Sequence, residues 1–184
     1  MDVVQEAPST VILAEDEASL YLQTTVQSVW APVGQTPIVR ADPGRIKTNF
    51  YGTLNLCTGK ELAMRADKMN ALTSAAHLMQ ILQAYPDRPI LLFWDRAPWH
   101  RGAAIRRVLE ANPRLEVTWF PVATPELNPQ EHVWKATRRA VSHNHTQARL
   151  PELADAFEHH LTTTTFDSSF LKQYGYASLC PMFT

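Results

Sequence analysis

The spacing of apolar and polar residues divides the chain into two parts. In the first part, short apolar and β-branched runs predict strands at residues 10–16, 26–30, 36–40, 47–56 and 62–65. The last two runs flank Thr58-Gly59, a turn pair that predicts a hairpin. We therefore expect the fold to open with a meander of antiparallel strands.

From residue 70 onward, helical and extended patterns alternate. Apolar residues predict helices at residues 70–83, 99–111, 128–142 and 153–162, and strands at residues 90–94 and 115–120. This order predicts an α/β fold. We expect a mixed sheet of three antiparallel strands and then parallel strands, with helices on both faces and ligands at the carboxyl ends of the central strands.

Length and composition favour one compact domain. With 184 residues, of which 45% are hydrophobic and 19% charged, the chain can bury its own core. We expect this core at residues 10–142 and a helical tail at residues 143–184. The longest apolar run is too short to cross a bilayer, the first residues lack a signal peptide, and Cys57 and Cys180 match no metal spacing. These features predict a cytoplasmic protein with ordinary thiols.

The charge of the chain bears on nucleic-acid binding. A net charge of -1 is unusual for a protein that holds DNA, because Lys and Arg neutralise the phosphates. The basic residues are unevenly distributed, however, and many fall in one stretch: Arg96, Arg101, Arg106, Arg107, Arg114, Lys135, Arg138, Arg139 and Arg149. A basic face is therefore compatible with the nearly neutral total.

Two aspartates follow predicted strands. Asp16 ends the first strand, on the face of Ala14 and opposite Glu15, and Asp95 follows a later apolar run in the same way. A carboxylate beside large apolar residues is costly to bury ionised, so a cation, a hydrogen-bond network or a water-filled cleft must compensate. Two plainer interpretations stay open: Asp16 is an exposed acid where its strand leaves the sheet, and Asp95 caps a helix.

Glu131 falls near the start of a predicted helix. Asn128 suits the N-cap, Pro129 the first helical position and Glu131 the third, which is the pattern of a capping box. A plain capping role is therefore open. However, 35 residues lie between Asp95 and Glu131, and the strand and helix start among them can bring both carboxylates to one end of the sheet.

Three converging carboxylates would repel one another, which raises the pKa of at least one of them and strains the metal-free domain. Two Mg²⁺ or Mn²⁺ ions, roughly 3.5–4 Å apart, would offset that charge. Hard cations suit oxygen ligands, whereas Zn²⁺ would prefer His or Cys. Asp16, Asp95 and Glu131 therefore predict a site for two divalent ions.

Three segments carry a resemblance to a known family. Residues 13–17 (LAEDE), 93–100 (FWDRAPWH) and 125–135 (PELNPQEHVWK) resemble the signature blocks of the DDE transposases of the mariner superfamily, in particular its bacterial insertion sequence 630 branch. Trp30 and the nearby sequence GQTP also resemble that family. The resemblance covers most of the chain, up to Lys135. It implies the ribonuclease H-like fold shared by transposases and retroviral integrases.

The resemblance implies roles for individual residues. Asp16, Asp95 and Glu131 become the metal ligands. The family usually has Asn after the second aspartate, so Arg96 is a departure that bears on the hydrogen bonding near the metal. His100 matches the family histidine, with a role near the scissile phosphate or a structural role at a helix start.

The helix predicted to carry Glu131 also bears candidate DNA contacts. Trp134 is predicted to pack in the core and fix the helix, with a base-stacking platform as the alternative. Lys135, Arg138 and Arg139, with Arg96, are candidates for phosphate binding, although a solvated helix face is the commoner explanation of such a cluster.

The reaction implied by the resemblance is cleavage at transposon ends followed by attack of the freed 3′-hydroxyl on a TA target. The implied partners are DNA and a second copy of the chain. Full-length relatives read the transposon ends with an N-terminal helix-turn-helix domain, and nothing before Thr10 can form one. We therefore expect a truncated form, half of a split transposase, or a remnant.

Two other interpretations of the function stay open. A ribonuclease or junction resolvase normally has a fourth carboxylate, for which the sequence offers no clear candidate. A non-catalytic DNA-binding or dimerising relic could regulate an active transposase. Arg96 and the missing reader domain favour the relic, and the intact triad argues against it.

Overall fold

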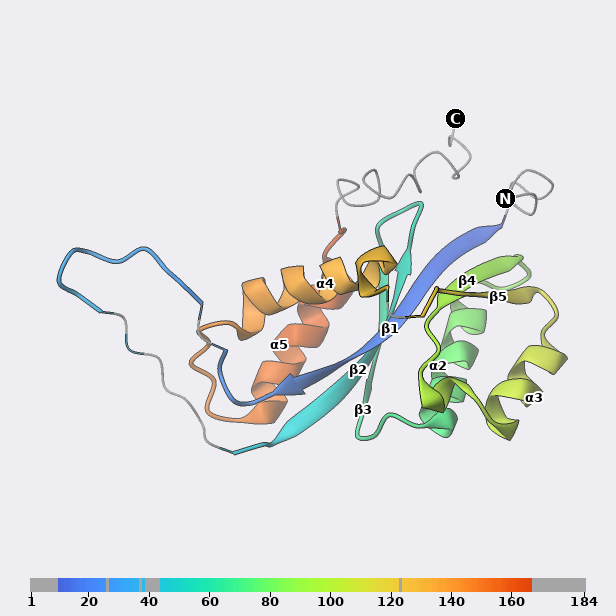
Figure 1. The fold of residues 1–184 in the computed structure, drawn as a ribbon, viewed down its shortest axis with the longest axis horizontal. Helices are drawn as coiled ribbons and strands as arrows, with labels where there is room; N and C mark the ends of the chain where they lie inside the picture. The colour runs from blue at the N-terminus through green and yellow to red at the C-terminus, as the bar shows by residue number, and fades with distance from the viewer. Residues whose placement is uncertain (1–9, 26, 37, 39–43, 123, 167–184) are drawn as a thin grey trace.

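The computed structural model describes residues 10–25, 27–36, 38, 44–122 and 124–166. In Figure 1, a twisted sheet has α4 and α5 on one side and α2 and α3 on the other. The strands are β1 (Val11–Tyr21), β2 (Lys47–Asn55), β3 (Glu61–Ala66), β4 (Ile90–Trp94) and β5 (Leu115–Trp119). The helices are α2 (Ala71–Ala84), α3 (Ala103–Ala111), α4 (Gln130–Thr137) and α5 (Leu150–Thr163), with short helical turns η1 (Pro98–His100), η2 (Pro125–Leu127) and η3 (Arg138–Ser142).

The sheet has the spatial order β3-β2-β1-β4-β5. β1 pairs antiparallel with β2, and β2 pairs antiparallel with β3. β4 runs parallel to both β1 and β5. The predicted mixed sheet, with three antiparallel strands followed by parallel strands, is confirmed. The predicted hairpin is confirmed too, and Gly59 takes a φ of 69° in its turn, a conformation that glycine adopts readily.

Alternating side chains of β1 contribute to two separate cores. Val11 and Leu13 face α2 and α3, where they join the apolar cluster that contains Leu78 and Ile105. The neighbouring residues of β1 point to the opposite face, where they join the cluster of Trp134 and the apolar residues of α5. The helices predicted on both faces of the sheet are thus confirmed.

Some strand predictions were wrong in extent. β1 continues past Asp16 to Tyr21, because its antiparallel pairing with β2 extends as far as Tyr21 and Lys47. The strand predicted at residues 26–30 is wrong, since residues 27–30 lie in no strand of the described structure and residue 26 lies outside it. Of the strand predicted at residues 36–40, the described Thr36 and Ile38 are not extended-sheet residues either, and the rest lies outside the described part.

Two helix predictions also needed correction. The helix predicted at residues 99–111 is divided into η1 and α3, because Gly102 precedes α3 with a φ of 120°, which interrupts helical geometry. The helix predicted at residues 128–142 begins only at Gln130, and its last turn, η3, is a π-helix. π-helical turns are rare and frequently occur at functional sites.

The core extends beyond the boundary expected at residue 142. Leu153, Phe157 and Leu161 of α5 are buried against the sheet together with Phe166. The segment expected as a helical tail therefore completes the core, at least up to Phe166, and residues 167–184 lie outside the described structure.

Two further expectations concern thiols and membranes. Cys57 is disulfide-bonded, so the expectation of ordinary thiols is wrong for it, and Cys180 lies outside the described residues. Among the described helices, none combines the length and the apolar character needed to cross a bilayer.

Candidate active site

The three predicted carboxylates line one pocket. Its volume is about 330 Å³, and it lies where β1, the end of β4 and the start of α4 meet. Its lining consists of Asp16, Asp95, Arg96, Ala97, Phe120, Pro121, Val122, Thr124, Asn128 and Glu131. Acidic groups from three separate parts of the fold therefore face this pocket, which we call the acidic pocket. Arg96 lines the same pocket.

The strand register brings the two aspartates together. β1 and β4 run parallel, with Ala14 paired to Phe93. Asp16 and Asp95 each lie two residues further along, so they lie at the same level on neighbouring strand paths. Asp95 thus follows its strand, as predicted, whereas Asp16 lies within β1 at the level where β4 ends.

Asp16 has a half-buried side chain with a specific donor. The indole Nε1 of Trp134 donates to its Oδ2 at 3.2 Å. Burial is the largest cause that raises the pKa of Asp16 to about 8. Repulsion from the carboxylates of Glu17, Glu131 and Asp95 acts in the same direction. Without a cation, this carboxyl group therefore tends to hold a proton at neutral pH.

Asp95 is stabilised as a carboxylate. Its Oδ1 accepts hydrogen bonds from the backbone N–H of Ala97, at 2.9 Å, and from Nδ1 of His100, at 2.8 Å. Burial alone would raise the pKa of Asp95, but these donors and the charge of His100 lower it below its usual value. The pKa values of the two aspartates in the pocket are thus shifted in opposite directions.

Glu131 lies in the first turn of α4, but the predicted capping box does not form. The N-cap of α4 is Pro129. Asn128 uses its side-chain oxygen to accept from the N–H of Gln130, at 3.1 Å, and its backbone oxygen to accept from the N–H of Glu131. The Glu131 carboxylate lines the pocket with the two aspartates.

Gly52 allows α4 to approach the sheet closely. It pairs with Asp16 across β1 and β2. A Cβ atom at this position would collide with Gln130, Trp134 and Glu61. The absence of a side chain at residue 52 therefore lets α4 bring Glu131 to the level of Asp16.

Glu61 is a buried carboxyl group that sequence reasoning missed. Its Oε1 accepts from Nε2 of Gln130, the first residue of α4, at 2.5 Å. Burial raises the pKa of Glu61 well above its usual value, and the charge of Asp16 contributes. Glu61 supports α4 beneath the pocket and is not among the residues that line it. Its isolated position in β3 gave no signal in the sequence.

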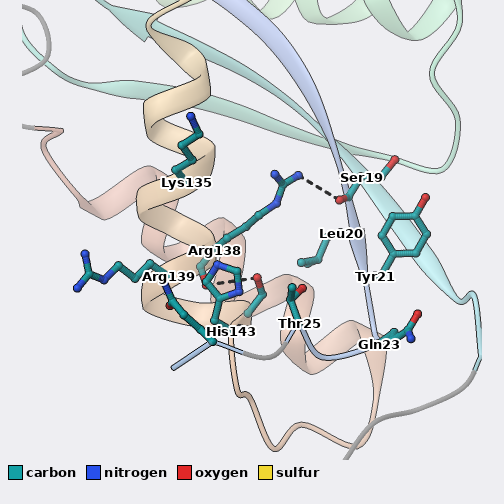
Figure 2. Close-up of a pocket in the computed structure, with 11 residues that line it drawn as sticks. Ser19, Leu20, Tyr21, Gln23, Thr25, Lys135, Arg138, Arg139 and His143 are labelled. Atoms are coloured by element: carbon teal, nitrogen blue, oxygen red, sulfur yellow. Dashed lines mark hydrogen bonds between the residues drawn. The ribbon is translucent and has the colours of Figure 1, made fainter. Parts of the chain in front are cut away.

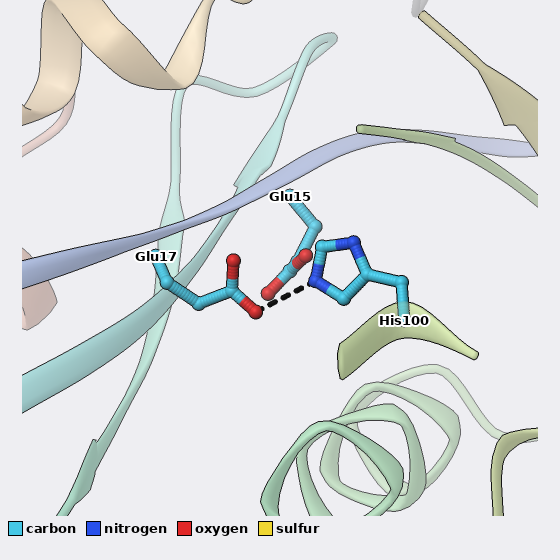
Figure 3. A group of neighbouring side chains, drawn as sticks. All are labelled: Glu15, Glu17 and His100. Carbon is cyan, nitrogen blue, oxygen red and sulfur yellow. Dashed lines mark hydrogen bonds and ion pairs between the residues drawn. The ribbon is translucent and has the colours of Figure 1, made fainter. Parts of the chain in front are cut away.

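His100 lies behind Asp95, outside the lining of the pocket. Figure 3 shows the carboxylates of Glu15 and Glu17 directed at its ring. Its Nε2 lies 2.7 Å from Oε1 of Glu17, and its Nδ1 contacts Asp95. Burial lowers the pKa of His100, but the hydrogen bonds to Asp95 and Glu17 outweigh it and raise the pKa to about 9.

The protonation of His100 also bears on metal binding behind the pocket. Ligand atoms of Glu15, Glu17 and His100 lie within 4.8 Å of one another, close enough to share a cation. Both ring nitrogens of His100, however, face carboxylates, which accept but do not donate when ionised. The imidazolium therefore supplies positive charge itself and has no lone pair left for a metal.

Three of the four candidate DNA-binding residues line a second cavity of about 630 Å³. Figure 2 shows Lys135, Arg138 and Arg139 on α4 and η3, with Arg138 reaching across to β1. Nη2 of Arg138 donates to the backbone oxygen of Ser19 at 3.5 Å. We refer to this cavity as the basic groove. Arg96 lies apart from it, at the acidic pocket.

Comparison with known proteins places the chain in a family. A family model described as "DDE superfamily endonuclease" matches residues 11–154. The chain belongs to the DDE superfamily endonucleases. The match includes Asp16, Asp95 and Glu131, and it confirms the family that the three sequence blocks indicated.

Relatives of this DDE superfamily chain come from mobile elements. It is 23% identical, over 155 residues, to an insertion element IS630 uncharacterized 39 kDa protein of Shigella sonnei; the alignment covers 84% of the chain and 45% of that protein. The mariner Mos1 paired-end complex with Mg has a TM-score of 0.68 at 16% identity, covering 95% of the chain and 57% of the solved chain. The chain thus spans about half the length of these relatives.

The fold is similar to that of a solved transposase catalytic domain. A structure of the Mos1 transposase catalytic domain with Raltegravir and Mn has a TM-score of 0.65 at 14% identity, and the match covers 100% of the chain and 90% of that domain. The predicted ribonuclease H-like fold is therefore confirmed.

The pocket carboxylates fit divalent cations. They offer only oxygen donors, which suit hard ions such as Mg²⁺ and Mn²⁺. Burial and the neighbouring carboxylates raise the pKa of Asp16 and so disfavour its ionised form, which a cation in the pocket would stabilise. The solved Mos1 relatives were obtained with Mg and with Mn.

Proposed function

We propose that this chain is the catalytic domain of a DNA transposase that cleaves DNA strands and transfers them to a target during cut-and-paste transposition. The observation that carries the proposal is the convergence of Asp16, Asp95 and Glu131 on one pocket of a DDE superfamily fold. Relatives from an insertion element and from mariner transposase complexes support it.

Asp16, Asp95 and Glu131 would hold two Mg²⁺ or Mn²⁺ ions. When bound, such ions activate a water or a 3′-hydroxyl as nucleophile and stabilise the leaving oxygen of the phosphodiester. The protein contributes a preset arrangement of ligands: Asp95 is fixed by Ala97 and His100, and Asp16 by Trp134. In this mechanism the carboxylates act as ligands and not as general acids.

Arg96 and the basic groove would contact the DNA backbone. Arg96 is exposed at the acidic pocket, where a guanidinium can pair with a phosphate beside the metal ligands. Lys135 is exposed on α4, which carries Glu131, and Arg139 is exposed on η3, which continues it. A DNA strand leaving the pocket can therefore follow these two elements toward the groove. His100 acts behind Asp95 in this proposal, away from the DNA.

The proposed partners are transposon ends, a TA target and a second copy of the chain. The relatives support DNA as the partner, since Mos1 was solved as a paired-end complex and as a strand transfer complex. Transposition ordinarily brings two ends together, and the resemblance to transposases therefore favours a dimer on DNA.

Cleavage of a supercoiled plasmid tests the proposal. With Mn²⁺, the chain should nick the plasmid, and Asp95→Asn and Glu131→Gln should abolish nicking. Glu126→Gln is the matched control, because Glu126 is an exposed carboxylate of η2 that does not line the described pocket. If the wild-type chain fails to nick DNA, the non-catalytic relic becomes the better interpretation. Faster cleavage of RNA–DNA hybrids or four-way junctions would favour another ribonuclease H-like nuclease.

A further inference from the structure

Glu17 follows Asp16 on β1 but lies on the other face of the sheet. Neighbouring side chains of a strand point to opposite faces, so Glu17 is directed away from the acidic pocket and shares the face of Glu15. Its side chain is only 2% exposed. Burying a carboxylate is unfavourable unless other groups pair with it, so a buried Glu17 needs hydrogen-bond donors nearby.

Two donors to Glu17 come from the turn that follows Asp95. Trp99 Nε1 and His100 Nε2 donate to Oε1 of Glu17 at 2.9 Å and 2.7 Å. The other ring nitrogen of His100 contacts Oδ1 of Asp95 at 2.8 Å. An uninterrupted chain of hydrogen bonds therefore runs from Glu17 on β1, through His100, to a carboxylate of the proposed metal site.

The orientation of the His100 ring is fixed on several sides. Its two nitrogens bond to carboxylates on opposite sides of the ring, so a flipped ring would lose both contacts. The ring of Trp94 stacks on it with centroids 4.0 Å apart. Asp95 Oδ1 accepts from Ala97 as well as from His100, so this oxygen is engaged twice. The other oxygen of Asp95 is then the one offered to a metal ion.

We propose that Glu17 is a positioning residue: it holds His100, and His100 holds Asp95 in the orientation that receives a divalent ion. This inference rests on the proposed function. Groups that hydrogen-bond to metal ligands orient them in advance, and their loss typically weakens metal affinity by about 10–100-fold. Glu17 acts one step further out, through the hydrogen bonds of the His100 ring to both carboxylates.

A metal-free experiment tests the positioning directly. Amide hydrogen exchange of Ala97, followed by NMR, reports whether Asp95 still accepts its hydrogen bond. Glu17→Gln should accelerate this exchange by about 10-fold. The Phe120 amide, which donates to the Trp94 backbone, should keep its rate and thereby exclude general destabilisation. Glu15→Gln is the matched control, because Glu15 lies on the same face of β1 and is buried, but no hydrogen bond joins it to His100 or Asp95 among the described residues.

A metal-binding experiment adds the functional consequence. Electron paramagnetic resonance of free Mn²⁺ gives its Kd for the wild type and each variant. Glu17→Gln should weaken Mn²⁺ binding about 10-fold, and Glu15→Gln should not. In a His100→Asn background, which keeps a donor for Asp95 but ends the link to Glu17, Glu17→Gln should have no further effect.

The outcomes separate this inference from the proposed function. If Glu17→Gln leaves Ala97 exchange at the wild-type rate, or weakens Mn²⁺ binding equally in the His100→Asn background, Glu17 is not a positioning residue. If Ala97 exchange accelerates but the wild type binds no Mn²⁺, the positioning stands and the proposed function fails. Should Glu17→Gln not fold, Trp99→Phe removes one donor to Glu17 and should shift exchange in the same direction.

Discussion

The indole N–H of Trp134 donates a hydrogen bond to Oδ2 of Asp16. Trp134 is 1% exposed and belongs to the core between the sheet and α5, whereas Asp16 lines the acidic pocket. A core residue of α4 is therefore hydrogen-bonded to a proposed metal ligand on β1. This contact couples the packing of the helix that carries Glu131 to the geometry of the site.

Replacing Trp134 by Phe should affect both packing and metal binding. The ring can still pack near Phe157, but Asp16 loses its donor and a small cavity forms. We expect a loss of about 1–3 kcal/mol in the free energy of unfolding, measured in urea, together with weaker Mn²⁺ binding. If Mn²⁺ affinity is unchanged, the contact does not help to orient Asp16.

Asp16→Asn and Asp95→Asn should change metal-free stability in opposite directions. The pKa of Asp16 is raised to about 8, so its stabilising contribution is present at low pH and is lost as the pH rises toward 8. Asp16→Asn should therefore raise Tm by several degrees at pH 8 and by little at pH 4. The pKa of Asp95 is lowered, so its contribution is present above its unfolded pKa, and Asp95→Asn should lower Tm at neutral pH. Thermal unfolding without metal measures the Tm of both variants. If the two substitutions change Tm in the same direction, the pKa values of Asp16 and Asp95 are not shifted in opposite directions.

His77 should make the protein less stable in mild acid. Its Nδ1 must donate to Oε1 of Gln80, so Nε2 accepts from Thr53 and the buried ring is neutral. Burial lowers its pKa to about 4, below the usual 6.5. The neutral ring contributes fully above pH 6.5, and stability falls between about pH 6.5 and pH 4, by on the order of 3 kcal/mol.

Urea unfolding at several pH values measures this dependence on His77. Replacing His77 by Gln removes the titrating group and should flatten the curve between pH 6.5 and pH 4. A variant that keeps the full wild-type slope would show that other groups cause it.

Gly52→Ala should disrupt the contact between the sheet and α4. The added Cβ would collide with Gln130, Trp134 and Glu61, and overpacking of this kind costs about 1–3 kcal/mol. Gly34→Ala is a useful contrast, because no described atom lies within 4 Å of its Cβ and only its φ of 85° is unfavourable. Chemical unfolding should show the larger loss for Gly52→Ala, and a smaller one would contradict the close approach of α4.

Charge removal in the basic groove should weaken DNA binding without sequence preference. Arg138→Gln and Arg139→Gln should each lower the salt dependence of binding by about one phosphate contact. Arg106→Gln and Arg107→Gln are controls, since both are exposed on α3, which packs on the other face of the sheet. Fluorescence anisotropy with duplex DNA at several salt concentrations measures how steeply the binding constant depends on salt. If the groove variants and the α3 variants change this dependence equally, the groove does not contact the DNA.

The carboxylates that converge on the pocket could be singled out in the sequence because their signals are local. Asp95 follows a continuous apolar run, and Glu131 lies in the first turn of a helix whose start is marked by Asn128 and Pro129. Asp16 was predicted on the correct face of its strand from two-residue alternation alone. The mixed sheet, the hairpin and the helices on both faces followed from periodicity in the same way.

The extent of several elements depended on partners that local patterns do not contain. β1 continues to Tyr21 because β2 continues to pair with it. The expected capping box does not form, because α4 begins at Gln130. The buried side chain of Gln130 donates a hydrogen bond to Glu61, a residue of β3 that is distant in the sequence. The boundary placed at residue 142 was wrong because α5 packs on the sheet.

By itself, the sequence determined which residues could form the site and which kinds of element carry them, since residue type and short-range spacing decide these features. Tertiary structure alone decided how the carboxylates differ: Asp16 meets burial and repulsion, whereas Asp95 meets His100. It also joined Glu17 to His100, 83 residues apart in the chain. Hydrogen bonds and desolvation depend on distances between groups far apart in sequence, and only the folded chain sets those distances.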